Sequence, residues 1–256
     1  MNVFVFDIET VPDVAAGRKL LDLEELKDED VANAMFHLRR QESGSEFLRH
    51  HLHRVVAISA VLRSGEKVKV WSLGEPDSDE ADLIRRFFDG IERFVPTLVS
   101  WNGGGFDLPV LHYRALLHGI SAPHYWEVGD EHRDFRYNNY LGRFHSRHTD
   151  LMDVLSGYQA RACAPLDQIA SLLGFPGKMG MSGAGVWDSY CAGDIAGIRN
   201  YCETDVLNTY LVYLRFELMR GRLTPEGYAR ETALLRATLG EDSKPHLQAF
   251  LEAWTG

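Results

Sequence analysis

Cysteine is scarce in this sequence, and the few cysteines form no recognisable pair. Cys163, Cys191 and Cys202 are the only 3 in 256 residues, and no two of them make a CxxC motif. An odd number of cysteines without such spacing argues against a secreted disulfide scaffold. The cysteine content therefore favours a reduced, cytoplasmic protein.

Long apolar runs and a net positive charge are also missing. No apolar run approaches membrane-spanning length, and no basic region followed by an apolar stretch begins the chain. The formal net charge of -10 argues against a protein that coats nucleic acid nonspecifically, because such binding depends on neutralising phosphates. An enzyme in which metal ions contact the phosphate is compatible with this charge. We predict a cytoplasmic protein with no membrane partner.

The overall composition is that of a globular α/β protein. Hydrophobic residues make up 45% of the chain and charged residues 25%, which is ordinary for a soluble domain. A chain of this length is sufficient for one large domain or two small ones. We expect a single domain over residues 1–256, with a helical insertion at about 18–53 and a C-terminal helical extension at about 222–256.

Hydrophobic periodicity predicts the order of strands and helices. Strands are expected at the start of the chain, at 54–62 and 67–72 as an antiparallel hairpin, at 97–102, and near 148–155 as a strand or turn. Helices are expected at 18–42, 77–94, 107–118, 165–174, 194–221 and 224–240, the last capped by Thr224 and ended by Gly240. This is the order of the ribonuclease-H-like α/β fold. That fold is a mixed sheet, with three antiparallel strands followed by parallel strands, flanked by helices.

Two acids interrupt the apolar run MNVFVFDIET at the start of the chain. Because strand side chains alternate between faces, Val3, Val5, Asp7 and Glu9 share one face. The two carboxylates are then roughly 7 Å apart along the strand. At an effective dielectric constant near 20, their repulsion is on the order of 2 kcal/mol. A bound cation would compensate for it.

Two further stretches place polar groups on helices. In WNGGGFDLPVL, three glycines allow a tight turn or a close backbone approach, and Asp107 follows at the expected start of a helix. In NYCETDVLNTYL, Tyr201 and Asp205 are four residues apart and therefore share a helix face. Taken singly, Asp107 fits an ordinary helix N-terminal acid and Asp205 an ordinary surface acid.

Together the three stretches resemble the motifs of DEDD-type 3′–5′ exonucleases, in the subclass whose last motif carries a tyrosine. FDIET corresponds to the first motif, NGGGFD to the second and YCETD to the third. The sequence is similar to the proofreading exonuclease domain of family B DNA polymerases and to stand-alone bacterial proteins predicted to be exonucleases of that kind. RHTDLMDVLS and PLDQIASLLG resemble the stretch between the second and third motifs, so the resemblance extends from residue 1 to about residue 220.

The resemblance implies that Asp7, Glu9, Asp107 and Asp205 are catalytic and bind two divalent ions, Mg²⁺ or Mn²⁺. These ions prefer oxygen ligands, and a pair of them about 3.5–4 Å apart can activate water and stabilise both oxygens of a phosphoryl displacement. Tyr201 completes the implied catalytic set. A phenol is a poor base at pH 7, so we expect Tyr201 to orient the attacking water and not to remove its proton.

Six residues are predicted to contact nucleic acid: Thr10, Asn102, Phe106, Arg143, Phe144 and His148. The first three belong to the matched motifs. The last three belong to residues 131–148, which mix arginines suited to phosphate with aromatic rings suited to base stacking. A solvated loop with a few packed rings explains this stretch equally well.

Other residues with metal-binding chemistry are assigned structural roles. Asp150 and Asp153 fit packing and capping, because the set of four acids is already complete. His50 and His53 lack the HExxH or CxxC partners of a zinc site, so we predict that they lie at the surface. The glycine-rich residues 174–185 do not have the spacing of a phosphate-binding loop and are predicted to form a mobile loop near the third motif.

The sequence thus predicts a two-metal-ion 3′–5′ exonuclease that hydrolyses single-stranded nucleic acid ends to nucleoside 5′-monophosphates, with DNA favoured. Its expected partners are the 3′ ends of single-stranded DNA or RNA, and no protein partner is indicated. Two alternatives stay open. One is an RNA-processing 3′–5′ exoribonuclease, since no residue visibly tests for a 2′-hydroxyl. The other is a catalytically weak nucleic-acid-binding module.

Overall fold

A five-stranded mixed sheet forms the centre of the molecule. The computed structural model describes residues 2–255. The strands are β1 (Asn2–Pro12), β2 (His53–Ser64), β3 (Lys67–Ser72), β4 (Thr97–Ser100) and β5 (His148–Asp150). Their order in the sheet is β3-β2-β1-β4-β5, with β1, β2 and β3 antiparallel to their neighbours and β4 and β5 parallel to β1. This is the ribonuclease-H-like fold that the sequence predicted.

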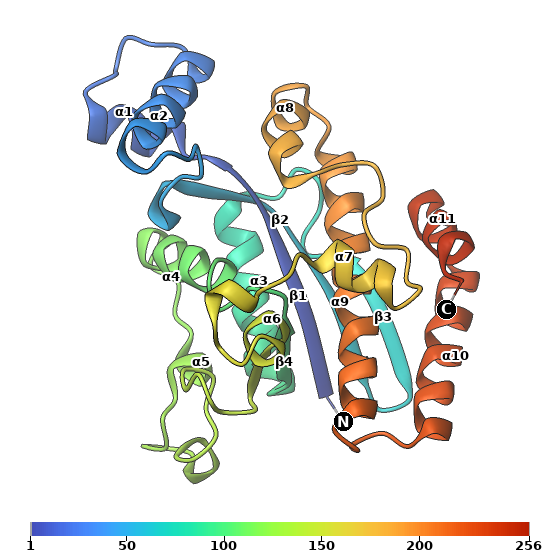
Figure 1. Ribbon diagram of the computed structural model, residues 1–256. Helices are drawn as coiled ribbons and strands as arrows, with labels where there is room; N and C mark the ends of the chain where they lie inside the picture. Colours follow the sequence, from blue (N-terminus) through green and yellow to red (C-terminus); the bar gives the residue numbers. More distant parts are fainter. Residues whose placement is uncertain (1, 256) are drawn as a thin grey trace.

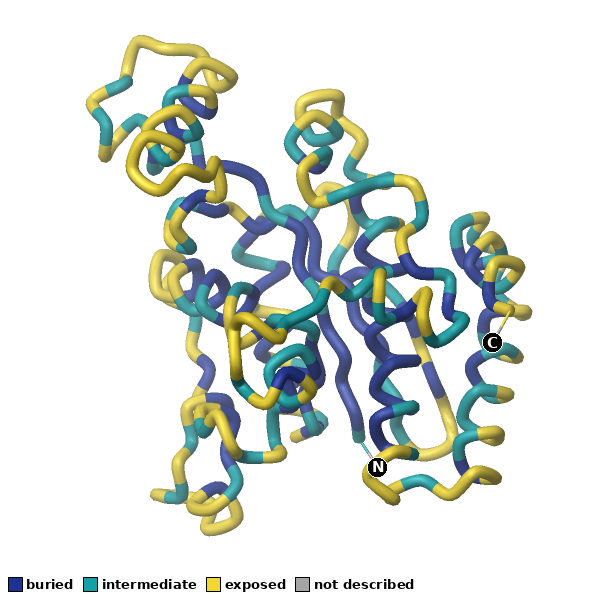
Figure 2. The backbone as a smooth tube through the Cα atoms, in the orientation of Figure 1, coloured by how far each residue is buried: buried dark blue, intermediate teal, exposed yellow. Residues whose placement is uncertain are grey.

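Helices cover both faces of this sheet. They are α1 (Val14–Leu21), α2 (Asp28–Ser43), α3 (Glu80–Phe94), α4 (Asp107–His118), α5 (Pro123–Trp126), α6 (Leu151–Leu155), α7 (Leu166–Leu172), α8 (Val186–Cys191), α9 (Ile195–Met219), α10 (Pro225–Glu241) and α11 (Pro245–Ala253). Figure 1 shows α9, α10 and α11 on one side of the sheet and α3, α4 and α5 on the other. The buried residues follow the central strands and α9, whereas α1 and α2 are largely exposed (Figure 2).

The alternation of β1 divides the core between the two faces. Val3 and Val5 pack with residues of α9, α10 and α11, while Phe4, Phe6 and Ile8 pack with residues of α3 and α4. Because side chains alternate along a strand, the positions that follow Val3 and Val5 on the same face are Asp7 and Glu9. The strand therefore directs the two acids toward α9, as the sequence predicted.

The insertion after β1 is two helices, and the prediction of one helix over 18–42 was wrong. The helix α1 begins at Val14 with Asp13 as its N-cap and ends where Asp22 takes a left-handed conformation, with φ at 55°. Acids then fill the first turn of α2, where they interact favourably with the helix dipole. Gly17 lets the two helices approach closely, since a Cβ there would lie 2.5 Å from Met35 Sδ.

The longest helix, α9, lies against the sheet along most of its length. Its predicted stripe of Ile198, Cys202, Val206, Tyr210 and Tyr213 is buried, and α7, α10 and α11 also contact the helix. Because so many of its sides are covered, α9 is apolar well beyond that stripe. Among residues 2–255, no helix combines the length and apolar character needed to cross a membrane.

The start of α10 was predicted correctly, but its end was not. Thr224 caps the helix by accepting a hydrogen bond from the Gly227 N–H at 3.1 Å. Gly240 does not stop the helix, which continues to Glu241. The helix ends because Asp242 is extended and accepts a hydrogen bond from the Lys244 N–H at 2.9 Å, immediately before Pro245 begins α11.

Candidate active site

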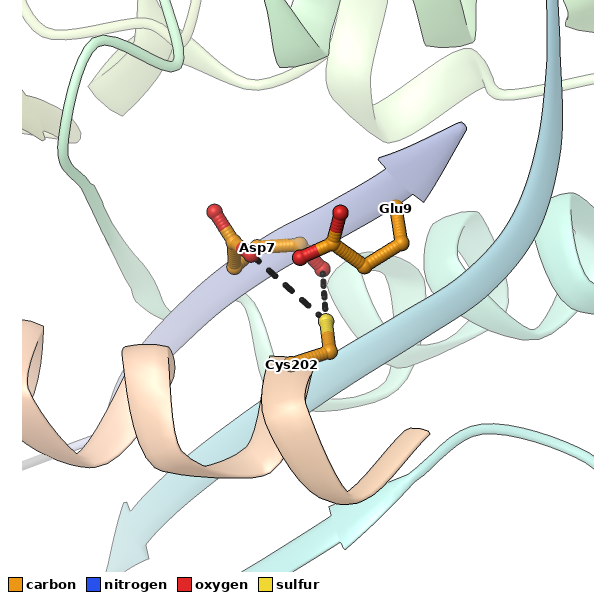
Figure 3. Close-up of side chains that lie close together, drawn as sticks. All are labelled: Asp7, Glu9 and Cys202. Atoms are coloured by element: carbon orange, nitrogen blue, oxygen red, sulfur yellow. Dashed lines mark hydrogen bonds between the residues drawn. The ribbon is translucent and has the colours of Figure 1, made fainter. Parts of the chain in front are cut away.

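The C-terminal half of β1 carries the first two predicted acids. Asp7 is half-buried and Glu9 is 8% exposed. Both lie beside Cys202 of α9, and one ligand atom of each of the three residues lies within 4.8 Å of the others (Figure 3). The Cys202 thiol donates to the main-chain oxygen of Asp7 at 3.4 Å and lies 3.6 Å from Asp7 Oδ2. The register between β1 and β2 shifts at Glu9 and Thr10, so the strand is irregular where the acids lie.

Asp107 reaches the same strand from the start of α4. The register of β1 with β4 runs only from Val3 to Val5, so the edge of β1 beyond Val5 is open on that side. Across this edge the N–H of Ile8 donates to Asp107 Oδ1 at 3.1 Å. Asp107 is 4% exposed. The hydrogen bond holds this third carboxylate next to the acid pair of β1.

Asp150 shapes the turn that leads to Asp107. The strand β4 ends at Ser100, earlier than predicted, because Asn102 turns the chain in a left-handed conformation with φ at 65°. Asp150 accepts hydrogen bonds from the N–H groups of Asn102 and Gly104, both at 2.9 Å, and caps α6. A Cβ on Gly103 would lie 2.3 Å from Ser100 Oγ, so this position requires glycine. Asp150 therefore has the capping role that the sequence predicted.

The helix α9 supplies Tyr201 and Asp205, one turn apart. Both residues are half-buried, and the Tyr201 hydroxyl forms a hydrogen bond with the Asp205 carboxylate. A small cavity of about 120 Å³ lies between these two residues and the loop that follows α7. Lys178 from that loop lines the cavity, and its charge lowers the pKa of Asp205. A positive charge therefore stands beside the last of the predicted acids.

A buried amide fixes the loop that carries Lys178. The side chain of Asn208, 1% exposed, accepts from the Gly177 N–H at 3.0 Å and donates to the Gly177 carbonyl at 2.8 Å. Gly177 has φ at 65°, a left-handed conformation that glycine adopts without strain. The two hydrogen bonds hold the loop against α9 one turn beyond Asp205.

The four carboxyl groups raise one another's pKa. Burial, followed by the charges of Asp107 and Glu9, raises the pKa of Asp7 well above its usual range. Burial and the charges of Asp205 and Asp107 do the same to Glu9. Burial raises the pKa of Asp107 to about 7 and that of Asp205 to about 6. Residues from β1, α4 and α9 are thus close enough to form one electrostatic cluster.

This cluster has the chemistry of a divalent cation site. Within residues 2–255, no lysine, arginine or histidine forms an ion pair with any of the four carboxylates. The Glu9 side chain, although more than nine-tenths buried, has no hydrogen-bond partner in that range. Carboxylate oxygens are the ligands that Mg²⁺ and Mn²⁺ prefer. Asp7, Glu9, Asp107 and Asp205 therefore fit such ions.

Three of the predicted nucleic-acid contacts lie next to the cluster. Thr10 follows Glu9 in the chain, and its Oγ1 lies 2.8 Å from His53 Nδ1. Phe106 precedes Asp107, and its ring centroid lies 5.0 Å from that of His53. Asn102 shapes the turn, since its carbonyl accepts from the Phe106 N–H at 2.9 Å. The prediction that His53 lies at the surface was wrong, because the residue is 8% exposed between these two motifs.

The other three predicted contacts gather on the far side of the glycine turn. Arg143 and His148 line a cavity of about 490 Å³ that Gly104 and Gly105 also border. Arg143 pairs with Asp153 at 3.1 Å. His148 Nε2 lies 2.8 Å from Ser100 Oγ, and burial lowers the pKa of His148 to about 4. The exposed Phe144 packs its ring edge to face on Tyr158.

Three residues of the site were not found by sequence reasoning: Cys202, Lys178 and Asn208. Cys202 was recognised only as part of an apolar stripe, and its contact with Asp7 joins positions 195 residues apart. A lysine inside the glycine-rich loop was a visible signal for Lys178, but no local pattern related it to Asp205. Asn208 is a polar residue within an apolar helix, a pattern that marks a buried hydrogen bond without naming its partner.

The fold and this cluster define the class of the protein. A ribonuclease-H-like sheet that collects carboxylates from its first strand and from two helices is the architecture of a metal-ion nuclease. The chain belongs to the family of predicted 3′–5′ exonucleases related to the exonuclease domain of PolB, whose model matches residues 45–254. The match includes Asp107, Tyr201 and Asp205, while Asp7 and Glu9 precede it.

Two polymerases are similar to parts or all of this chain. A stretch of 46 residues is 41% identical to the catalytic polypeptide of DNA polymerase epsilon from Saccharomyces cerevisiae, covering 18% of this chain and 2% of that protein. The family B DNA polymerase of the hyperthermophilic archaeon Pyrobaculum calidifontis has a similar structure, with a TM-score of 0.48 and 19% identity over 98% of this chain. The chain spans only 27% of that polymerase.

Proposed function

We propose that the protein is a two-metal-ion 3′–5′ exonuclease that removes nucleoside 5′-monophosphates from single-stranded ends, with DNA the favoured substrate. The observation that carries this proposal is the cluster of four carboxylates, brought together from β1, α4 and α9 without a basic partner in an ion pair within residues 2–255. Membership of the exonuclease family supports the same reaction.

In this proposal Asp7, Glu9, Asp107 and Asp205 hold two Mg²⁺ or Mn²⁺ ions. Such ions, when bound, supply positive charge to the phosphate, lower the pKa of a water molecule and stabilise the leaving 3′-oxygen. The protein's part is to keep the four carboxylates in place. The Ile8 N–H fixes Asp107, and the Cys202 thiol and the Tyr201 hydroxyl orient Asp7 and Asp205.

Tyr201 and Lys178 have separate parts in the mechanism. Burial and the charge of Asp205 raise the pKa of Tyr201, so the phenol stays protonated at neutral pH. A protonated phenol can donate or accept one hydrogen bond, which suits the orientation of the attacking water and excludes the role of base. Lys178 is exposed at the small cavity beside Asp205 and offers a positive charge to a substrate phosphate there.

Replacing Tyr201 by phenylalanine is expected to slow cleavage by about 10²–10³, or roughly 3–4 kcal/mol, as for the loss of one positioned donor or acid–base group. The ring and its packing are retained, so substrate affinity should hardly change. Single-turnover cleavage in Mn²⁺ and strand binding in Ca²⁺ measure the two quantities. A Tyr201→Phe protein that cleaves as fast as the wild type, where chemistry limits the rate, would assign the tyrosine to packing alone.

The products and their order of release test the proposed reaction. A 5′-labelled single strand should shorten stepwise from its 3′ end, and chromatography should detect nucleoside 5′-monophosphates. The same sequence made as RNA should be cleaved more slowly. Faster cleavage of the RNA would establish the exoribonuclease instead. Binding without cleavage of either strand in Mn²⁺ would establish a binding module.

A further inference from the structure

The segment that returns from α2 to β2, residues 45–53, touches both motifs that flank the acid cluster. His53 lies 2.8 Å from the hydroxyl of Thr10, the residue after Glu9. His50 Nε2 donates to the Gly105 carbonyl at 2.9 Å, two residues before Asp107. The segment belongs to the insertion, and its position beside both motifs suggests more than a connecting role.

His53 anchors the segment as a neutral, buried ring. Burial lowers the pKa of His53 to about 4, so the ring is uncharged at neutral pH. Its Nε2 lies 3.2 Å from the Leu48 carbonyl, which can only accept, so Nε2 carries the proton. Nδ1 therefore accepts from the Thr10 hydroxyl. This arrangement links the insertion to the end of the acid-bearing strand.

Phe47 is held in a fixed place with much of its ring uncovered. Arg39 Nε donates to the Phe47 carbonyl at 2.9 Å, and the next residue, Leu48, is buried in a small core with Val31 and Met35. The Phe47 residue itself is 55% exposed. Anchoring on both sides with an exposed ring between them is unfavourable for a residue that only packs, and favourable for one that meets a ligand.

The rings of Phe47, Phe106 and His50 form one surface beside the cluster. The Phe47 centroid lies 5.2 Å from that of Phe106, and the His50 centroid lies 5.8 Å from it. Phe106 directly precedes Asp107. A strand with its terminal phosphate at the acids would therefore have its last nucleoside beside these rings.

We propose that Phe47, contributed by the insertion, and Phe106 form a stacking platform for the base of the 3′-terminal nucleotide. The proposal rests on the proposed exonuclease function. Aromatic rings stack on every base, so the platform recognises the presence of a terminal base and not its identity. The ligand is a nucleobase at the end of a single strand.

The test compares protein and strand variants in one double-mutant cycle. The strands end in thymidine, in an abasic 3′ residue, or carry the abasic residue five positions upstream. The proteins are the wild type, Phe47→Ala, Phe47→Trp and the control Leu20→Ala, an exposed apolar residue of α1 in the same insertion. Fluorescence anisotropy in Ca²⁺ gives Kd for each pair, and thermal melting verifies the fold.

We expect Phe47→Ala to weaken binding of the thymidine-ended and upstream-abasic strands about 5- to 100-fold, the range for loss of one stacked base. Binding of the 3′-abasic strand should be unchanged. Phe47→Trp should bind like the wild type, since it keeps a stacking ring, and so should Leu20→Ala. Equal weakening for all three strands, or none, would overturn the platform. Absence of cleavage by the wild type in Mn²⁺ would overturn the proposed function, whereas the platform is judged on binding alone.

Discussion

Asp7→Asn is expected to melt at a higher temperature than the wild type in EDTA and to lose nearly all cleavage activity. Without a cation, Asp7 lies in a buried cluster of like charges. Asparagine removes its share of the repulsion, which is about 2 kcal/mol for the pair with Glu9. At about 2–4 °C per kcal/mol, the melting temperature should rise by roughly 4–8 °C. Loss of a metal ligand should lower the rate by about 10³ or more, because metal charge contributes several kcal/mol.

The metal response should reverse this order of stability. A ligand present at 100 times its Kd stabilises the folded protein by about 2.7 kcal/mol. Mn²⁺ should therefore raise the melting temperature of the wild type and leave that of Asp7→Asn nearly unchanged. Calorimetry in EDTA and in Mn²⁺ measures both effects, with Asp89→Asn on the exposed face of α3 as the control. An undiminished Mn²⁺ response in Asp7→Asn would contradict the proposed ligand set.

The raised pKa values give the metal-free protein a defined pH dependence. A carboxyl whose pKa is higher in the folded than in the unfolded chain holds its proton more tightly when folded, so stability falls as the pH rises from about 4 through the folded pKa. The folded pKa is about 7 for Asp107 and about 6 for Asp205. In EDTA the melting temperature should therefore fall between pH 5 and pH 8. The fall should be smaller in Mn²⁺, which favours the ionised carboxylates, and calorimetry across this range measures it.

Arg114→Ala is expected to destabilise the fold by about 3–5 kcal/mol, the range for breaking a buried ion pair. Arg114, 4% exposed, donates to both oxygens of Glu80 and pairs with Asp13 at the end of β1. Glu80 also accepts from the Val55 N–H at 2.7 Å and lies 2.8 Å from His118 Nε2. Removing the guanidinium leaves two buried carboxylates without their main partner.

Urea unfolding measures this loss, and an exposed pair on α3 provides the control. Arg86 pairs with Asp82 at 2.7 Å, but the Arg86 side chain is 53% exposed, so Arg86→Ala should change the stability little. If Arg114→Ala lost no more stability than Arg86→Ala, the network at the base of the insertion would be unimportant for the fold. Cleavage by the Arg114→Ala protein should persist below its melting temperature, because Arg114 belongs to none of the proposed catalytic groups.

The parts of the site that follow from local periodicity were predictable from the sequence. Strand alternation predicts that Asp7 and Glu9 share a face, and a spacing of four on a helix does the same for Tyr201 and Asp205. The approach of Asp107 to β1 depends on the parallel pairing of β1 with β4, which no local pattern specifies. Resemblance to the exonuclease motifs supplied that third acid.

The remaining features depend on contacts between distant segments. His53 is buried because it lies between Thr10 and Phe106, and a cluster of three histidines gives no sign of this. Gly240 stays within its helix because the conformation of Asp242, and not the glycine, determines where the helix ends. The position of Lys178 depends on the Asn208 side chain, 31 residues from its partner Gly177. Local propensity carries no information about such contacts.

The time course of cleavage of a 5′-labelled single strand, measured for the wild type and Asp205→Asn purified side by side, tests the central claim most directly. The claim is that the four carboxylates form a metal-dependent centre for cleaving 3′ ends. It predicts that the wild type shortens the strand from its 3′ end in Mn²⁺ and not in EDTA, and that Asp205→Asn is slower by about 10³ or more. Equal activity of the two proteins, or activity of the wild type that survives EDTA, would contradict the claim.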